Sequence, residues 1–138
     1  MQEKIGLYPV KLSLAGEMPG APSLELDLLV TAPTGKVNGT ARITQALPPP
    51  YGEIFIPDVT GQINHTGFGK DTMLVGLHGD YTVSVPPPAI GTYLAHFTAA
   101  LAVDASWNGT GTYSYGKTTI ANAKVTNVSA DASQREPA

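Results

Sequence analysis

Residues 6–46 read GLYPVKLSLAGEMPGAPSLELDLLVTAPTGKVNGTARITQA and contain the clearest pattern in the chain. Apolar side chains occupy every second position from Leu24 to Val30, and Glu25 and Asp27 stand between them. This period of two is typical of a β-strand that buries one face and exposes the other. Turn-forming clusters precede and follow it, at residues 19–22 and 33–35. The segment therefore predicts half-buried strands joined by tight turns.

The same alternation recurs along most of the chain. It predicts about eight or nine strands at spacings of about 8–12 residues, which is the pattern of an all-β sandwich or barrel. Both architectures produce the same alternation, and we take an antiparallel sandwich as the first expectation and a closed barrel as the second. A turn is expected at Gly79-Asp80. The apolar positions of the other segments lie within residues 8–14, 37–47, 73–77, 81–85 and 107–115.

The segment Thr92–Ala105 fits two interpretations. As a strand it would direct Tyr93, Phe97 and the alternate residues up to Val103 inward, and as a short helix it would align Leu94, Phe97 and Leu101 on one stripe. Short apolar runs are poorly separated by periodicity alone. The neighbouring strands favour the strand, which would place His96 on its polar side.

Length and composition limit the class of protein. The chain has 138 residues, no Cys, 14% charged residues and a net charge of −3. We expect a single all-β domain over residues 1–128 and a flexible C-terminal tail over residues 129–138. The eight Lys and Arg residues are scattered, so no nucleic-acid partner is expected. No secretory signal or membrane-spanning segment is recognisable, which predicts a cytoplasmic protein, with export by a non-classical route left open.

Three motifs could indicate sites but fit structural roles better. The proline runs Pro48–Pro50 and Pro86–Pro88 cannot lie inside a sheet, and stiff corners explain them better than docking peptides. The segment Gly67–Thr72 resembles a phosphate loop, yet it lacks the required glycine spacing and carries Asp71 where Ser or Thr must bind magnesium. We therefore expect a hairpin tip there.

Residues able to carry catalysis or hold metal are scattered. His65, His78 and His96 lie 13 and 18 residues apart and do not form a metal-binding motif. Glu25 and Asp27 alternate with buried positions and should face solvent, where nothing favours a role in acid–base catalysis. The chain contains no G-x-S-x-G or H-E-x-x-H motif. We expect no enzyme, no cofactor and no metal site.

Aromatic residues supply the one candidate binding site. Trp107, Tyr113 and Tyr115 are expected on one strand face, where they could form a platform for a sugar or another small ligand. A single Trp at an inward position is more often part of the core. Trp107, Tyr113 and Tyr115 are the ligand-binding residues that the sequence predicts, with a place in the core as the alternative.

The quoted segment also carries a family resemblance. Residues 6–12 (GLYPVKL), 19–22 (PGAP), 28–30 (LLV) and 35–50 (GKVNGTARITQALPPP) resemble the bacterial domain of unknown function 1842 family, and Trp107 with the tyrosines after it fits loosely. The resemblance covers residues 6–128 and is strongest over the first forty. It implies a small β-rich protein without an assigned activity, cofactor or catalytic motif.

These observations lead to an ordered set of functional hypotheses. The first is a non-catalytic binding or self-assembly module that associates with itself or another protein through strand faces of low charge. The second is a small-ligand or carbohydrate-binding barrel or sandwich that uses the aromatic residues. The third is a membrane-active, toxin-like β protein, and a membrane is the least favoured partner.

Overall fold

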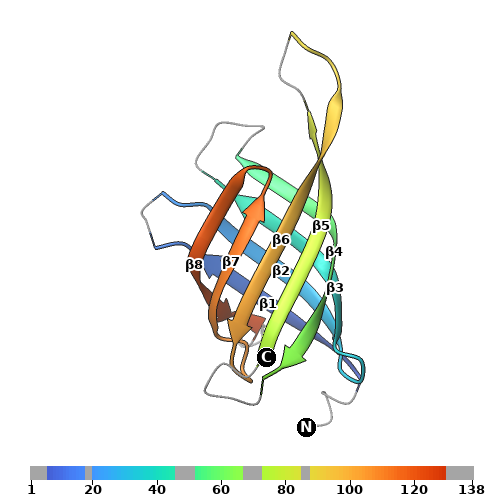
Figure 1. The fold of residues 1–138 in the computed structure, drawn as a ribbon, viewed down its shortest axis with the longest axis vertical. Coiled ribbons are helices and arrows are strands. Elements are labelled where there is room, and N and C mark those ends of the chain that lie inside the picture. The colour runs from blue at the N-terminus through green and yellow to red at the C-terminus, as the bar shows by residue number, and fades with distance from the viewer. Residues whose placement is uncertain (1–5, 18–19, 46–51, 67–72, 85–87, 130–138) are drawn as a thin grey trace, which may run out of the picture.

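The computed structural model shows an antiparallel sheet that closes on itself as a barrel (Figure 1). The structure describes residues 6–17, 20–45, 52–66, 73–84 and 88–129. Within these ranges each of eight strands pairs with the next in sequence, and β8 pairs with β1. The strands are β1 (Leu7–Ala15), β2 (Ser23–Thr31), β3 (Lys36–Thr44), β4 (Glu53–His65), β5 (Met73–Ser84), β6 (Thr92–Val103), β7 (Gly109–Tyr115) and β8 (Thr118–Asn127).

The all-β prediction is confirmed, but the preference for a sandwich was wrong. Closure depends on the pairing of β1 with β8, which sets Leu12 opposite Asn127 and Ala15 opposite Lys124. These partners are more than a hundred positions apart in sequence. Alternation reports which side chains are buried and carries no information on which strand lies beside which. A sandwich and a barrel therefore could not be separated by it.

The barrel interior is filled with apolar side chains. Alternate residues of every strand point inward, and Tyr113, Phe97 and Leu26 are completely buried. Eight strands enclose a space just wide enough for side chains to fill, so this interior is a packed core. The strand interpretation of residues 92–105 is correct, and His96 lies on its exposed face. The turn expected at Gly79-Asp80 is absent, because β5 runs straight through it to Ser84.

Two irregularities bend the sheet. In β4, Ile56 and Val59 are both buried and pair with Ala41 and Gly39, so one extra residue lies between them at Pro57-Asp58. Proline has no amide hydrogen to donate and is tolerated where a bulge interrupts the ladder. A second shift lies in β8, where Asn122 has a φ of 57°. Asn is among the residues that adopt this left-handed conformation at low cost.

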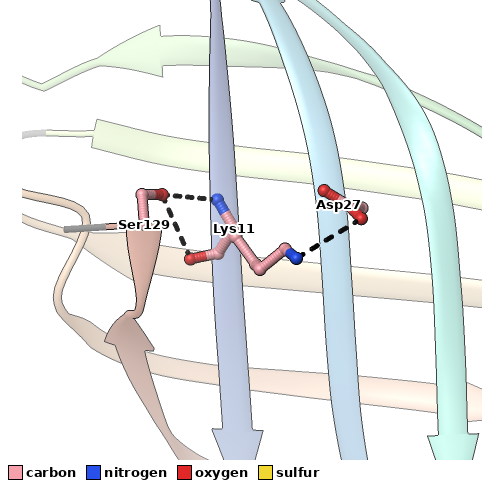
Figure 2. Close-up of polar contacts among 3 residues, drawn as sticks. All are labelled: Lys11, Asp27 and Ser129. Carbon is pink, nitrogen blue, oxygen red and sulfur yellow. Dashed lines mark hydrogen bonds and ion pairs between the residues drawn. The ribbon is translucent and has the colours of Figure 1, made fainter. Parts of the chain in front are cut away.

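The seam between β1 and β8 is short and is extended by side chains (Figure 2). Four residue pairs join these strands, and beyond them the Val128 amide donates to the Lys11 carbonyl oxygen at 2.8 Å. The Lys11 amide then donates to Ser129 Oγ at 2.7 Å, and Lys11 Nζ lies 4.0 Å from Asp27 on β2. Ser129, the first residue of the expected tail, is thus attached to the barrel. Residues 130–138 lie outside the described ranges.

Candidate functional site

Two strands extend beyond the barrel wall as a hairpin. The pairing of β5 with β6 continues to Ser84 opposite Thr92, whereas in the described residues β4 leaves β5 at Val59 and Gly79. On the other side, β7 pairs with β6 only from Phe97 onward. Residues 80–84 and 92–96, here called the arm, therefore rise from the rim of the barrel, at the top of the view (Figure 1). The wall is open between the first part of β4 and the arm.

A cleft of about 510 Å³ occupies this opening at the base of the arm. Side chains from both faces of the sheet line it: Ile54, Tyr81 and Val83 have the inward register, and Phe55 and Thr82 have the outward register. A cleft lined by both registers lies at the edge of the wall, where β4 and β5 have separated. Its lining consists of Gln45, Glu53, Ile54, Phe55, Tyr81, Thr82, Val83, Ser84, Tyr93, Tyr115 and Thr118.

Three tyrosines give the cleft its character. Tyr81 and Tyr115 are 7% and 5% exposed, whereas Tyr93 on the arm is 55% exposed. The Tyr115 hydroxyl donates to Gln45 Oε1 at 2.8 Å, which fixes the ring at the mouth of the barrel. Tyr113 stacks on Tyr115 with the ring centroids 6.2 Å apart and donates to the Pro22 carbonyl oxygen at 3.1 Å. The cleft thus has a rigid aromatic floor and a more exposed aromatic wall.

The phenols of this cluster stay protonated over the ordinary pH range. Burial is the main cause that raises the pKa of Tyr81, and the neighbouring Tyr115 and Tyr93 raise it further. Burial also raises the pKa of Tyr115, and burial together with Tyr115 raises the pKa of Tyr113 to about 12. The hydroxyls therefore act as neutral hydrogen-bond donors and acceptors.

The shift at Tyr113 predicts a loss of stability in alkali. An unfolded tyrosine ionises near 10.0, whereas folded Tyr113 ionises near 12. The native state then holds a proton that the unfolded chain has released, so stability is complete below pH 10 and falls as the pH rises toward 12. This difference in pKa corresponds to a loss of about 2–3 kcal/mol in the free energy of unfolding. Urea unfolding measured against pH should show this decline, and Tyr113→Phe should reduce its slope; an unchanged slope would contradict the assignment.

Opposite charges cancel at the outer edge of the cleft. Arg42 Nε lies 3.1 Å from Glu53 Oε2, and the Arg42 guanidinium sits over the Phe55 ring at 5.8 Å from its centroid. Both charged side chains are about half exposed, so the pair contributes little to stability. The pair matters for the charge of the cleft, because Glu53 is the one charged residue among the described lining residues and it is already paired with a cation.

The structure places the predicted site residues in two different regions. Tyr113 and Tyr115 lie together below the cleft, and Tyr115 lines it. Trp107 is in the connection between β6 and β7, at the opposite end of the barrel, and is 2% exposed. The three aromatic residues do not form one platform, and ligand binding by them remains a prediction.

Several lining residues were missed by the sequence analysis. Tyr93 was expected to face inward, and it does keep the inward register, but its strand has already left the barrel there and its ring is exposed. Gln45, Glu53 and Tyr81 come from other strand ends. No sequence signal marks these residues, because they meet only where β4 separates from β5.

Trp107 closes the other end of the barrel within a loop organised by Asp104. Asp104 Oδ1 accepts hydrogen bonds from the amides of Ser106 at 2.8 Å and Asn108 at 3.1 Å. The Trp107 amide donates to the Asp104 carbonyl oxygen at 2.9 Å, and Trp107 has a φ of 68°. The Asn127 amide donates to Asn108 Oδ1 at 2.9 Å, which attaches the loop to the end of β8.

The histidines lie apart on the outer surface. His96 Nδ1 is 2.6 Å from Asp80 Oδ1 at the base of the arm, and His78 Nε2 is 3.3 Å from Thr60 Oγ1. Within the described ranges, no three His, Cys, Asp or Glu side chains are close enough to hold a metal ion. The phosphate-loop-like segment 67–72 and the proline run 48–50 lie outside the described residues, as do Pro86 and Pro87 of the second run.

Two shallower hollows of about 420 and 630 Å³ lie on the barrel wall across β3 to β8. Among the described residues their linings include no Tyr, Phe or Trp, and they do include small residues such as Gly76 and Ala100. They provide little surface to hold a ligand. The cleft below the arm is therefore the candidate site.

The described part of the chain contains no helix long and apolar enough to cross a membrane.

Comparisons with known proteins give one positive result. A search of curated proteins finds no match. The model of one family, described as a domain of unknown function (DUF1842), matches residues 5–120, which is most of the chain. The protein belongs to this family of unknown function.

Proposed function

We propose that this protein is a non-catalytic binding module that takes a small ligand in the cleft at the base of the arm. The observation that carries the proposal is the cleft itself, with a volume of about 510 Å³ and a lining that combines four aromatic rings with hydroxyl and amide groups. Ligand sites in proteins are concave, mostly apolar and equipped with a few polar groups, and the mouth of a β-barrel is a common place for them.

The packing of the barrel supports a site at the mouth. Phe97, Tyr113 and Leu26 are completely buried members of the packed interior, so a ligand would rest on the core at the mouth. Tyr81 and Tyr115 form the floor of this site and are held by burial, which prepares the surface before a ligand arrives. The site needs little ordering on binding.

The lining suits binding better than catalysis. As far as the structure describes it, the lining contains no His, Lys or Cys, and Glu53, its one described carboxylate, is paired with Arg42. A nucleophile with an adjacent base, or a carboxyl group with a strongly shifted pKa, would favour catalysis. We therefore propose a binding protein, and we keep the cytoplasm as its proposed location.

Self-assembly is a second candidate, favoured by the exposed apolar residues of the hairpin. Ile90 is 97% exposed and Leu94 is 59% exposed, and both belong to the hairpin that projects from the barrel. A strand that has left its partner also presents free amide and carbonyl groups to another chain. Sedimentation velocity over a range of concentrations, on the parent and on Leu94→Ser, tests this candidate. A monomer at every concentration would contradict it.

Backbone amide NMR tests the ligand site directly. We expect compounds from a chemically diverse fragment library to shift the amides of residues 53–56, 80–84 and 92–96, with little change around Asp104 and Trp107. Trp107 itself is unsuited to report binding because it lies at the other end of the barrel. A library that shifts no amide, or shifts only those far from the arm, would contradict the proposal.

A further inference from the structure

We infer that the ligand of the arm cleft is a neutral carbohydrate, a ring with several hydroxyl groups and an apolar face. This inference rests on the proposed binding function and adds the chemical class of the ligand. Three properties of the cleft support it: the cancellation of charge, the density of hydroxyl groups and the placement of the aromatic rings.

The paired charges at the edge of the cleft favour a neutral ligand over an ion. An anion in the cleft would meet the carboxylate of Glu53, which Arg42 Nε already contacts at 3.1 Å. A cation would meet a carboxylate whose charge Arg42 already balances, since the Arg42 guanidinium sits over the Phe55 ring of the lining, 5.8 Å from its centroid. Among the described lining residues an ion would therefore find no uncompensated charge to bind. A neutral ligand leaves the pair intact.

Hydroxyl groups dominate the polar part of the lining. Tyr81, Tyr93, Thr82, Ser84 and Thr118 each carry a hydroxyl that both donates and accepts a hydrogen bond. Burial raises the pKa of Tyr81 and of the neighbouring Tyr115, so these two phenols remain protonated. Sugar hydroxyls have the same dual capacity, so the two sets can pair without leaving unsatisfied groups. A purely apolar ligand would strip water from these hydroxyls and return no hydrogen bonds.

The aromatic rings supply the apolar surface that a sugar ring needs. Tyr81 and Tyr115 form a buried floor, and Tyr93 rises beside it on the arm with more than half of its surface exposed. Val83 lies opposite Tyr93 in the same register and completes this side of the cleft. A flat ring can therefore lay its C–H face on Tyr93 while its hydroxyls reach the hydroxyl groups around it. The volume of about 510 Å³ accommodates one or two sugar units.

Amide NMR titrations of the full chain test the inference with four probes. The probes are short neutral oligosaccharides of glucose, galactose and N-acetylglucosamine, oligogalacturonate as their anionic counterpart, choline as a cation, and octanol as an apolar compound. We expect at least one neutral oligosaccharide to shift the amides of residues 53–56, 80–84 and 92–96 and to bind at least about tenfold more tightly than the other three probes.

Variants of the arm separate stacking from general damage. Tyr93 is exposed, so the Tyr93→Ala variant should fold normally. Its affinity for the neutral oligosaccharide should fall by about tenfold or more. Tyr93→Phe keeps the ring and should retain most of the affinity. Leu94→Ala is the matched control, because Leu94 is similarly exposed on the next position of the same strand, points to the other face and does not line the cleft.

Each outcome has a defined meaning. Binding of oligogalacturonate, choline or octanol in the cleft, without a neutral oligosaccharide, would overturn the carbohydrate inference and leave the proposed binding function standing. Equal loss of affinity in Tyr93→Ala and Leu94→Ala would also overturn the inference. If neither these probes nor the fragment library shift the amides of the cleft, both the inference and the proposed function fail.

Discussion

Replacing Gly61 by alanine is expected to lower the free energy of unfolding by about 3 kcal/mol, because the barrel has no room for a methyl group there. A Cβ atom at Gly61 would lie 2.0 Å from the Gly76 carbonyl oxygen and 2.6 Å from Leu77 Cδ2. The first of these atoms is backbone on the neighbouring strand and cannot rotate away. β4 would have to move from β5 beside the place where the two strands already separate. A loss of about 3 kcal/mol corresponds to a melting temperature lower by roughly 10 °C.

Gly76→Ala is the matched control on the adjacent strand. Gly76 pairs opposite Gln62, the residue after Gly61, and a Cβ atom there would meet nothing within 4 Å. Both substitutions reduce the freedom of the unfolded chain by a similar amount, worth about 0.4–1 kcal/mol. The difference between the two variants in urea or thermal unfolding therefore measures the native clash alone. Equal stability of the two variants would show that β4 and β5 are not as close as this structure has them.

These two glycines show how far a sequence can predict this fold. Both stand in strands whose alternation is plain, so the strands and their buried faces could be recognised from residues such as Val75 and Leu77. Nothing in the sequence distinguishes Gly61, which allows two backbones to approach, from Gly76, which faces open space. The same limit concealed barrel closure, since the pairing of Leu12 with Asn127 is a long-range contact.

The candidate site was less predictable than the fold for a related reason. Tyr115 was recognised as a possible ligand contact, but its partners Gln45 and Tyr81 come from strand ends far away in sequence. Tyr93 illustrates the point most directly. The alternation along its segment correctly predicts an inward register for Tyr93. The exposure of its ring follows only from the length of the β5–β6 pairing, which continues beyond the point where β6 and β7 separate. Register is a local property, whereas the point at which neighbouring strands separate is a property of the whole sheet.

Replacing Trp107 by alanine is expected to have an effect at least as large as that of Gly61→Ala, about 3–5 kcal/mol, because it removes the side chain that closes one end of the core. Trp107 is 2% exposed and packs with the buried cluster of the barrel. Its loop is held independently by Asp104, whose carboxylate accepts two backbone amides, so the loop can keep its shape and leave a cavity beneath it. Trp107→Phe, which keeps an aromatic ring, should recover much of this loss.

The backbone of Trp107 makes a second comparison informative. Its φ of 68° lies in the left-handed region, which costs non-glycine residues roughly 1–2 kcal/mol. At an ordinary strand position glycine is less stable than alanine, but here Trp107→Gly relieves the strain that Trp107→Ala retains. We therefore expect the glycine variant to be at least as stable as the alanine variant in urea unfolding followed by far-UV circular dichroism. If the alanine variant is clearly more stable, the left-handed conformation of this loop is wrong; if both match the parent, Trp107 does not close the barrel.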